Sequence, residues 1–362
     1  MDAHEQRTLA AGFDPNKLAA SFYEDPYPVY AALCSCDPVH RCPDGTYLLS
    51  RYADLDRIYR DRTAFSSDKK QAFAPKFGVG SPLYEHHTTS LVFNDAPYHT
   101  RVRRPIVGAL TPHVLKAMEP DVVALVDALL DRMEAQRDVD LIADYAAAVP
   151  ATAVTEFCTY LRELIAHQRR HPAGDDDLLT RLLGDDQLTA AELAQNCVFL
   201  LNAGHETTTN LVGNGLHLLL TNPQSLQRLR AQPQLIATAV EECLRFESSN
   251  QLGNRLVVER SAVRDVVLEP GTYLTLCIGA ANRDPEEFAD PDRFDITRQP
   301  NRHLAFAAGA HACAGMAVAR LEGRIAIGRA VQRFPEMHLV GTGVRGHRAR
   351  FRGFTSLRAH MG

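Results

Sequence analysis

The sequence predicts a mainly α-helical fold with small β-sheets, organised as a single domain over residues 1–362. Three observations lead to this prediction. Hydrophobic residues recur at helical spacing over most of the chain. Runs that alternate as strands do are few and short. No internal repeat, low-complexity tract or linker divides the chain, although 362 residues would allow two or three domains.

In the first third of the chain, glycine and proline separate short elements. The expected elements are, in order, a helix over 21–33, a hairpin over 38–50 that turns at Asp44-Gly45, and a helix over 52–62. The stretch 65–90 is rich in turn residues and predicts a long irregular loop, a type of loop that often carries function.

Helices dominate the remainder, and short strands interrupt them only once. The expected helices cover 97–137 with a break at Thr111-Pro112, then 153–170, 190–220, 234–247 and 313–334. The expected strands cover 255–260, 263–268 and 272–277. This order of elements supports one layered, mainly α-helical domain.

Composition narrows the class of protein. A net charge of −5 argues against a generally basic nucleic-acid binder. No run of about 18 apolar residues predicts a membrane-spanning helix, and the first residues lack the apolar core of a signal peptide. The eight cysteines lack the paired C-x-x-C spacing of a zinc site and lie mostly in apolar stretches. We therefore expect reduced cysteines in a cytoplasmic protein that binds neither nucleic acid nor membrane.

The most specific local feature is a loop of small residues that leads into an apolar helix. It runs from Phe306 to Gly315 as F-A-A-G-A-H-A-C-A-G and places Cys313 at the start of the helix. Unpaired amides and the positive end of the helix dipole are expected to lower the pKa of this cysteine. A thiolate held in this way suits a nucleophile or an axial metal ligand, and a plain core cysteine is the alternative.

This loop resembles the haem-binding loop of the cytochromes P-450, whose pattern is F-[G/S]-x-G-x-[H/R]-x-C-x-G. Five of the six fixed positions match, and the departure is Ala307, where Gly or Ser is usual. Further matches follow in the family's order over nearly the whole chain, starting with F-Y-E-D-P-Y-P at 22–28. The resemblance implies the cytochrome P-450 fold, with Cys313 as the thiolate ligand of haem iron and Phe306 against the cofactor.

A second match concerns the fold rather than the chemistry. Glu242 and Arg245 form an E-x-x-R pair on one helix, and Arg293 lies in a segment resembling the one that supplies another arginine in the family. An E-x-x-R pair alone is weak evidence, because helices often carry such pairs on solvated faces. By resemblance, the three residues form a buried charged network that stabilises the fold.

The third match is A-G-H-E-T-T at residues 203–208, within a long apolar helix. A mid-helix glycine beside polar residues fits a core helix poorly, and such a local conflict is where a functional site is expected. The resemblance makes this stretch, with Gly204, the groove that faces the haem. There Thr207 would hydrogen-bond dioxygen and Glu206 would relay protons from solvent. The alternative is a kinked core helix whose threonines bond to their own backbone.

The fourth match is a set of cationic side chains. His99 and Arg103 reproduce an H-x-x-x-R pattern, Arg255 follows the E-x-x-R helix after an extended segment, and His311 lies in the cysteine loop. By resemblance, these four residues bind the two haem propionates through charge-assisted hydrogen bonds. Each of them taken singly could equally be a surface charge.

The resemblance implies an O2-dependent monooxygenase that holds haem b, and we expect it to oxidise, by hydroxylation or a related reaction, a small, largely apolar organic molecule. A thiolate ligand favours O–O cleavage, while the protein positions the substrate and manages protons. The expected substrate contacts are Leu200, Ala203, Leu252 and Asn254.

Electrons are expected from separate proteins, a ferredoxin and a ferredoxin reductase, because little sequence follows the last helix. An acidic ferredoxin would be steered to a basic face despite the net negative charge. The arginines proposed for this face are Arg101, Arg104, Arg302, Arg320 and Arg324.

Two alternatives come from other classes of protein. The first is a non-catalytic haem-binding protein of the same fold, against which the pair Glu206 and Thr207 argues. The second is a thiolate enzyme without haem, which would need a base beside Cys313. His311, two residues away, is the only nearby candidate in sequence.

The chain is also shorter than its motifs imply. A-A-A-V-P at 146–150 is followed almost at once by A-V-T-E-F at 153–157, whereas bacterial relatives place a further helix and loop between such stretches. In the family that piece forms part of the lid over the substrate. Part of the lid helices is therefore expected to be absent near residues 150–153, either deleted or omitted from the printed sequence, and we favour the second explanation because lids are mobile.

Overall fold

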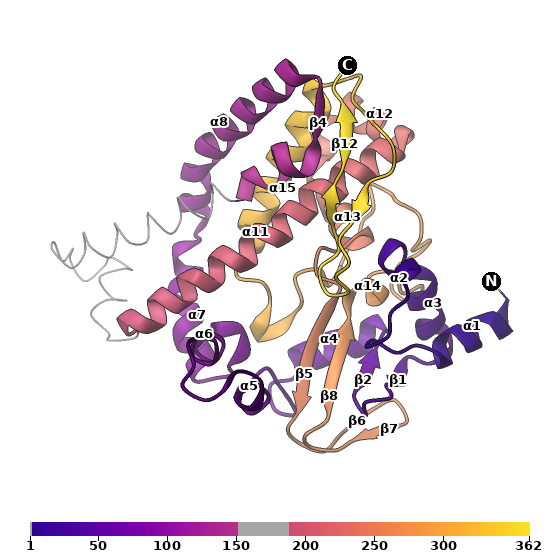
Figure 1. The fold of residues 1–362 in the computed structure, drawn as a ribbon, viewed down its shortest axis with the longest axis vertical. Helices are drawn as coiled ribbons and strands as arrows, with labels where there is room; N and C mark the ends of the chain where they lie inside the picture. Colours follow the sequence, from indigo (N-terminus) through magenta and orange to yellow (C-terminus); the bar gives the residue numbers. More distant parts are fainter. Residues whose placement is uncertain (1, 151–187) are drawn as a thin grey trace.

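The computed structural model describes residues 2–150 and 188–362, and within them helices predominate over a few small sheets (Figure 1). The longest helix, α11 (Ala190–Thr221), crosses the body of the molecule. It packs against α13 (Ile236–Phe246) and α15 (Met316–Arg333). The predicted fold class, mainly α with small β-sheets, is confirmed.

The other helices have the following bounds. They are α1 (Ala3–Ala11), α2 (Ala20–Glu24), α3 (Tyr27–Cys36), α4 (Tyr52–Arg60), α5 (Lys70–Phe77), α6 (Pro82–Thr89), α7 (Tyr98–Ala109), α8 (Pro112–Gln136), α12 (Pro223–Ala231) and α14 (Ile278–Ala281). Short helical turns are η1 (Leu91–Phe93), η3 (Pro233–Leu235) and η4 (Gly309–His311), and η2 (Leu141–Ala146) is a π-helix.

The strands form one five-stranded sheet and smaller ones in the part of the chain that the structure describes. The large sheet has the order β1 (Val39–Arg41), β2 (Tyr47–Leu49), β8 (Tyr273–Cys277), β5 (Leu252–Val257), β3 (Phe65–Ser66). Only β2 and β8 pair in parallel. The smaller sheets are β4 (Asp138–Asp140) with β12 (Arg358–His360) and β9 (His338–Leu339), β10 (Val344–Arg345) with β11 (Phe354–Ser356), and β6 (Ser261–Val263) with β7 (Val266–Leu268).

One expectation about local structure is wrong. The stretch 65–90 is not an irregular loop, because it contains α5 and α6. Its turn residues mark helix boundaries instead of a loop. Gly78 ends α5 at φ +77°, a conformation that favours glycine, and the Ser81 hydroxyl accepts the Tyr84 amide at 3.2 Å to begin α6.

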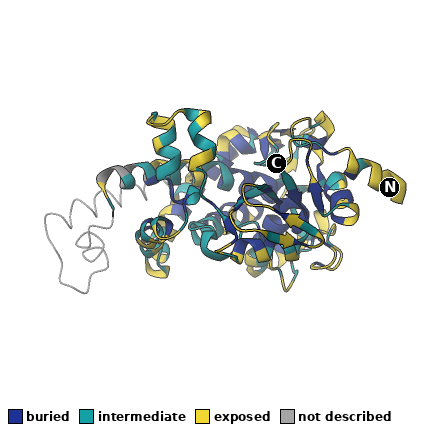
Figure 2. Ribbon diagram, turned by 90° about the horizontal axis from the view of Figure 1, so that it is seen from below, coloured by how far each residue is buried: buried dark blue, intermediate teal, exposed yellow. Residues whose placement is uncertain are grey.

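The main hydrophobic core lies where α8, α11, α13, α15 and η2 meet. Figure 2 shows the buried residues gathered inside this body, whereas α1 near the N-terminus is largely exposed. The burial of α11 changes along its length. Leu211, Val212 and Leu216 are buried, whereas Ala203 is exposed to solvent. The change falls at the A-G-H-E-T-T stretch, so this part of α11 is more open to solvent than the part that follows it.

The E-x-x-R pair is completely buried. Arg245 donates two hydrogen bonds to the Glu242 carboxylate, both at 2.8 Å, and neither side chain is exposed. Glu242 also accepts the Asp295 amide at 2.9 Å and the Asn301 amide group at 3.1 Å. The Glu242 carboxylate therefore fastens α13 to the segment that leads into the cysteine loop.

The expectation for the third arginine is wrong. The Arg293 side chain is 70% exposed, and only its carbonyl oxygen joins the network, by accepting Arg245 at 3.2 Å. The second guanidinium belongs to Arg298, whose Nε lies 3.3 Å from Glu242. Arg293 lies just after the turn at Asp290, where its side chain points to solvent, whereas Arg298 comes after the chain has folded back.

Two further expectations concern the lid and the membrane. The expected helix 153–170 and most of the expected lid boundary near residues 150–153 lie outside the described residues. In the ranges 2–150 and 188–362, no helix combines the length and the apolar character that crossing a bilayer requires.

Glu242→Gln should strongly destabilise the fold, because it leaves the fully buried Arg245 without its counter-charge. We expect the free energy of unfolding to fall by about 3–5 kcal/mol, measured by urea unfolding followed by circular dichroism.

Glu269→Gln is the matched control, since Glu269 pairs with Arg260 at 3.1 Å with both side chains more than half exposed. It should cost less than about 1 kcal/mol. Equal unfolding midpoints for the two variants would show that the Glu242 network does not stabilise the fold.

Candidate functional site

The cysteine loop is closed on itself and pressed against α4. The Cys313 amide donates to the Phe306 carbonyl at 2.9 Å, and Gly309 has φ +69°. A Cβ on Gly309 would lie 2.2 Å from the Tyr59 carbonyl oxygen, so only glycine fits there. Ala307, the departure from the family pattern, has φ +55°, a left-handed conformation that strains alanine more than glycine.

The expectation that the pKa of Cys313 is lowered is wrong for the polypeptide alone. Burial raises the pKa of the Cys313 thiol, although the Gly315 amide and the charges of Arg103 and Arg320 act in the opposite direction. Cys313 precedes the first residue of α15, Met316, so the helix dipole acts on it only from a distance. The loop therefore presents a sulfur whose thiolate needs a further positive partner, such as a metal ion.

The four predicted cationic residues converge beside this loop. The Arg103 guanidinium donates to the Ala312 carbonyl at 2.6 Å. The rings of His99 and His311 lie 4.0 Å apart. Arg255 is buried and stacks over the Tyr59 ring at 5.0 Å. These side chains come from α7, the cysteine loop and β5, so the fold brings together what the sequence separates.

Positive charge at this point exceeds negative charge. In the described part of the chain, Asp95 is the one carboxylate that bonds to the group, through His311 Nε2 at 3.2 Å. Asp95 also accepts the Ser66 hydroxyl and the Ser67 amide, and its pKa is lowered by these bonds against the effect of burial. Burial and the neighbouring cations lower the pKa of His99 to about 4. Asp95 is thus the one carboxylate bonded to Arg103, Arg255 and the two histidines in the described residues.

Unpartnered ring nitrogens at the same place indicate what kind of ligand fits. His99 Nε2 and His311 Nδ1 are buried and have no hydrogen-bond partner within the described residues. The pKa of Arg255 is lowered mainly by burial, with Tyr59 and Asp95 as weak counter-charges. Buried polar groups normally have partners. These residues therefore fit a ligand that carries carboxylates beside Cys313, as the two propionates of haem would be.

The groove residues of α11 adopt helical hydrogen bonding. The Thr207 hydroxyl donates to the Ala203 carbonyl at 2.7 Å, and the Thr209 hydroxyl donates to the His205 carbonyl at 2.9 Å. This back-bonding is what the kinked-helix alternative predicted. Thr207 is nevertheless partly exposed whereas Thr209 is buried, so only the Thr207 oxygen is accessible to accept another bond.

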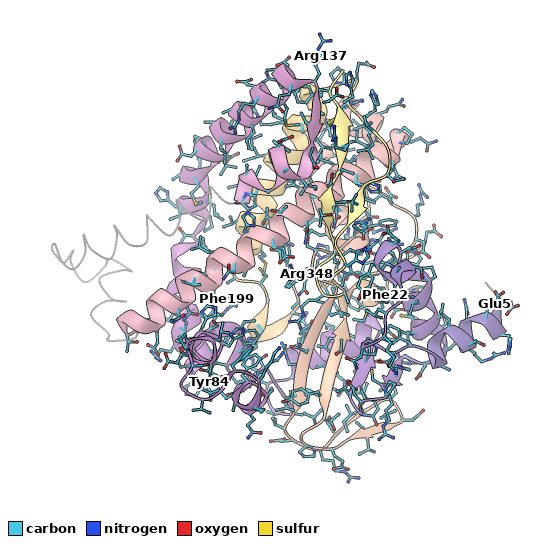
Figure 3. The ribbon with its side chains drawn as sticks, in the orientation of Figure 1. Glu5, Phe22, Tyr84, Arg137, Phe199 and Arg348 are labelled. Carbon is cyan, nitrogen blue, oxygen red and sulfur yellow. The ribbon has the colours of Figure 1, made fainter. Side chains whose placement is uncertain are left out.

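Glu206 is not a lone carboxylate. It forms an ion pair with Arg348, and the two side chains are 35% and 57% exposed. Figure 3 shows Arg348 near the centre of the molecule, between α11 and the strands β5 and β8, while Phe199 and Tyr84 lie farther along α11 and on α6. Glu206 thus lies where solvent and the interior of the site meet.

The predicted substrate contacts differ in their exposure and packing. Leu200 is partly buried and Ala203 is exposed, and both lie on the more exposed part of α11. Asn254 on β5 accepts a hydrogen bond from the Lys69 ammonium. Leu252 packs instead against a cluster of N-terminal side chains, so its packing gives no support to a substrate contact.

Three residues of the site were missed in the sequence. Lys69 and Arg350 lie beside Arg255, and Glu322 of α15 is buried against Thr208 of α11. Burial raises the pKa of Glu322 to about 7, although Thr208 opposes the shift. The signal for Glu322 was available, since a glutamate inside the apolar stripe of α15 has no place in a core helix. Nothing in the sequence marked Lys69 or Arg350.

The alternative of a thiolate nucleophile finds no support in the geometry. His311 is the histidine nearest in sequence, but its Nε2 faces Asp95. Across residues 2–150 and 188–362, the structure shows no hydrogen bond between the Cys313 sulfur and a histidine. A nucleophile needs a base within hydrogen-bond reach, so this arrangement suits a metal ligand better.

Comparison with known proteins agrees with the site. A family model described as Cytochrome P450 matches residues 151–237 and 230–340. Cytochrome P450 107B1 of Saccharopolyspora erythraea is 36% identical over 387 positions, covering 92% of this chain and 94% of that protein. The vitamin D(3) 25-hydroxylase of Pseudonocardia autotrophica is 34% identical over 365 positions, covering 89% of each. The crystal structure of CalO2 has a TM-score of 0.85 at 29% identity, covering 97% of this chain and 99% of that one.

The chain therefore belongs to the cytochrome P450 family. Members of this family are haem- and iron-dependent monooxygenases, so the protein is an oxidoreductase.

The comparison also bears on length. The 387 positions aligned with the first relative exceed the 362 residues of this chain, so that relative carries residues with no counterpart here. This agrees with the shortfall expected from the motifs.

Proposed function

We propose that this protein holds haem b through Cys313 and uses O2 to oxidise a small, largely apolar organic molecule, with electrons from a ferredoxin and its reductase. The observation that carries the proposal is the convergence beside Cys313 of two arginines and two histidines that share one carboxylate, Asp95, and two of whose ring nitrogens have no partner in the described residues. A relative named as a hydroxylase supports the type of reaction. The described cysteines are all free thiols, which supports a reducing, cytoplasmic location.

The residues divide the binding of haem among them. Cys313 would ligate the iron, and His99, Arg103, Arg255 and His311 would bind the propionates through charge-assisted hydrogen bonds. Gly204 would allow close approach of α11 to one side of the ring, and Phe306 would pack against it from the cysteine loop. When bound, a thiolate-ligated haem supplies the reductive activation of dioxygen.

Proton delivery would fall to Glu206 and Thr207. Glu206 is held at the solvent boundary by Arg348, which keeps its carboxylate in place while both side chains stay partly exposed. Thr207 Oγ1, whose own proton is directed to the Ala203 carbonyl, can accept a hydrogen bond from a group bound above it. The pair thus connects solvent to one defined atom of the site and directs protons to it.

Thr207→Ala should uncouple NAD(P)H consumption from product formation, because the proposed proton route then lacks the Thr207 hydroxyl. We expect NAD(P)H consumption to continue while product formed per NAD(P)H falls by about 10-fold or more. The measurement is the ratio of product to cofactor consumed in the reconstituted enzyme.

Thr209→Ala is the matched control, since Thr209 is a neighbouring threonine with the same back-bonding but a buried hydroxyl. Thr207→Ser should restore coupling. A wild-type ratio in Thr207→Ala would remove Thr207 from the proposed proton route.

The proposed docking face for the ferredoxin is narrower than the sequence suggested. Two of its arginines are bound by carboxylates, Arg101 by Glu192 at 3.0 Å and Arg320 by Glu241 at 2.7 Å. The arginines that project into solvent are Arg104, Arg302 and Arg324, from α7, the segment before the cysteine loop and α15. These three elements flank Cys313, so they provide a basic approach to the site.

The double variant Arg104→Glu with Arg324→Glu should slow reduction by an acidic ferredoxin about 10-fold or more at low salt, with the difference shrinking as salt screens the charges. Stopped-flow reduction of the haem measures the rate.

The double variant Arg7→Glu with Arg358→Glu changes the net charge equally at exposed positions on α1 and β12. It should reduce at nearly the wild-type rate. If both double variants slow equally, the effect comes from net charge and the docking face is wrong.

A further inference from the structure

Two cations near the site are left over after the proposed haem ligands are assigned. Lys69 precedes α5, and its ammonium donates a hydrogen bond to the Asn254 side chain. Arg350 lies in the C-terminal segment. The pKa of Lys69 is lowered to about 7, first by burial and then by the charges of Arg350, Arg255 and Lys76. Lys69 therefore lies near enough to Arg255 and Arg350 for their positive charges to act on it.

Neither leftover cation has an acidic partner in the described ranges. The structure shows no salt bridge from Lys69 or Arg350 to a carboxylate of residues 2–150 or 188–362. Burial lowers the pKa of Arg350, and only the Tyr59 phenol acts in the other direction. Burial in turn raises the pKa of Tyr59 to about 12. Half-buried charges without counter-charges are costly, so these two cations point to an anion that the described residues do not supply.

The backbone holds both residues in place. The Arg350 carbonyl accepts the Gln251 amide at 2.8 Å, and the Arg352 amide donates to the Ser249 carbonyl at 2.9 Å. The Arg352 side chain is bound in turn by buried Glu247 and by the Tyr23 carbonyl. The segment that carries Arg350 is therefore strapped to the residues that precede β5.

Strand pairing and backbone hydrogen bonds hold the chain on both sides of Lys69. Its segment follows β3, which pairs with β5 at Ser66 and Leu256. The Ser67 amide donates to Asp95 at 3.1 Å, and the Asp68 carboxylate accepts the Lys70 amide at 2.8 Å. Both cations are thus positioned before any ligand arrives, which lowers the entropic cost of binding one.

An aromatic cluster adjoins the cationic pair. The Phe73 ring lies 5.4 Å from that of Phe77 and 5.1 Å from that of Phe93, and the Lys69 ammonium lies 5.5 Å from the Phe93 centroid. His86 Nδ1 of α6 lies 2.8 Å from Gln195 Oε1 of α11, so this hydrogen bond connects α6 to the more exposed part of α11. A ligand here would meet charge at one point and apolar surface next to it.

From these contacts we infer that Lys69 and Arg350 form a subsite for the carboxylate of the substrate, beside Asn254 and the aromatic cluster. The substrate class is an organic acid with an apolar body. Two cations supply the charge-assisted bonds that recognise a carboxylate, and the aromatic rings take the apolar part. The inference rests on the proposed function for the reaction, but the binding it describes can be measured without turnover.

The test compares an acid with its uncharged ester on the holoenzyme. Isothermal titration calorimetry with dodecanoic acid and methyl dodecanoate gives the two dissociation constants independently of any product. We expect the acid to bind about 10-fold more tightly or better, and Lys69→Gln and Arg350→Gln each to weaken the acid about 10-fold while leaving the ester unchanged.

Lys70→Gln is the matched control, because Lys70 is the adjacent residue, is exposed and is bound by Asp68. It should leave both dissociation constants unchanged, and Lys69→Arg should retain binding of the acid. Equal affinity for acid and ester, no binding of the acid, or equal effects of the substitutions on both ligands would overturn the subsite.

Haem content and product formation distinguish the carboxylate subsite from a haem-binding role and from the proposed function. If Lys69→Gln or Arg350→Gln lowers the haem content of the purified protein, the two residues bind the cofactor and the subsite is overturned. If acid binding depends on both residues but no oxygen-dependent product of the acid forms, the subsite stands and the proposed function fails. If other substrates are oxidised while acid and ester bind alike, the proposed function stands and the subsite fails.

Discussion

The buried carboxylate of Glu242 holds together the parts of the molecule on which the site depends. It binds Arg245 on its own helix, Arg298 and Asn301 from the following segment, and the backbone at Asp295. That segment leads directly into the cysteine loop, and α15 continues from it. One fully satisfied anion therefore determines where Cys313 lies relative to α11 and β5, because its bonds leave the intervening chain little freedom.

Around Cys313 the balance of charge is the opposite. His99, Arg103, Arg255 and His311 face one carboxylate, Asp95, and two of their ring nitrogens have no partner in the described residues. The Glu242 carboxylate is completely satisfied, whereas these ring nitrogens are not, so this place fits an anionic partner that the described residues do not supply. Haem with two propionates would meet this need at the cysteine loop, and a substrate carboxylate would meet it at Lys69 and Arg350.

The sequence predicted the fold class, the hairpin and the break before α8, because turn and capping residues have local effects that short patterns record. It placed Cys313 in a loop of small residues at the start of the last helix, and α15 begins at Met316. It chose Arg293 over Arg298, since which guanidinium reaches Glu242 depends on how the chain folds back. It also missed Lys69 and Arg350, which meet only through strand pairing and the C-terminal segment, and it took two short helices for a loop because their boundary residues are also those of turns.

The central claim is that Cys313 is the thiolate ligand of a haem, and the spectrum of the reduced protein under carbon monoxide tests it most directly. We expect the red-shifted Soret band of a thiolate-ligated haem for the wild-type protein and for Cys36→Ser, which changes an exposed cysteine on α3. We expect Cys313→Ser to lose that band. A wild-type protein without the band, or a Cys313→Ser variant that keeps it, would show that Cys313 is not the thiolate ligand of a haem.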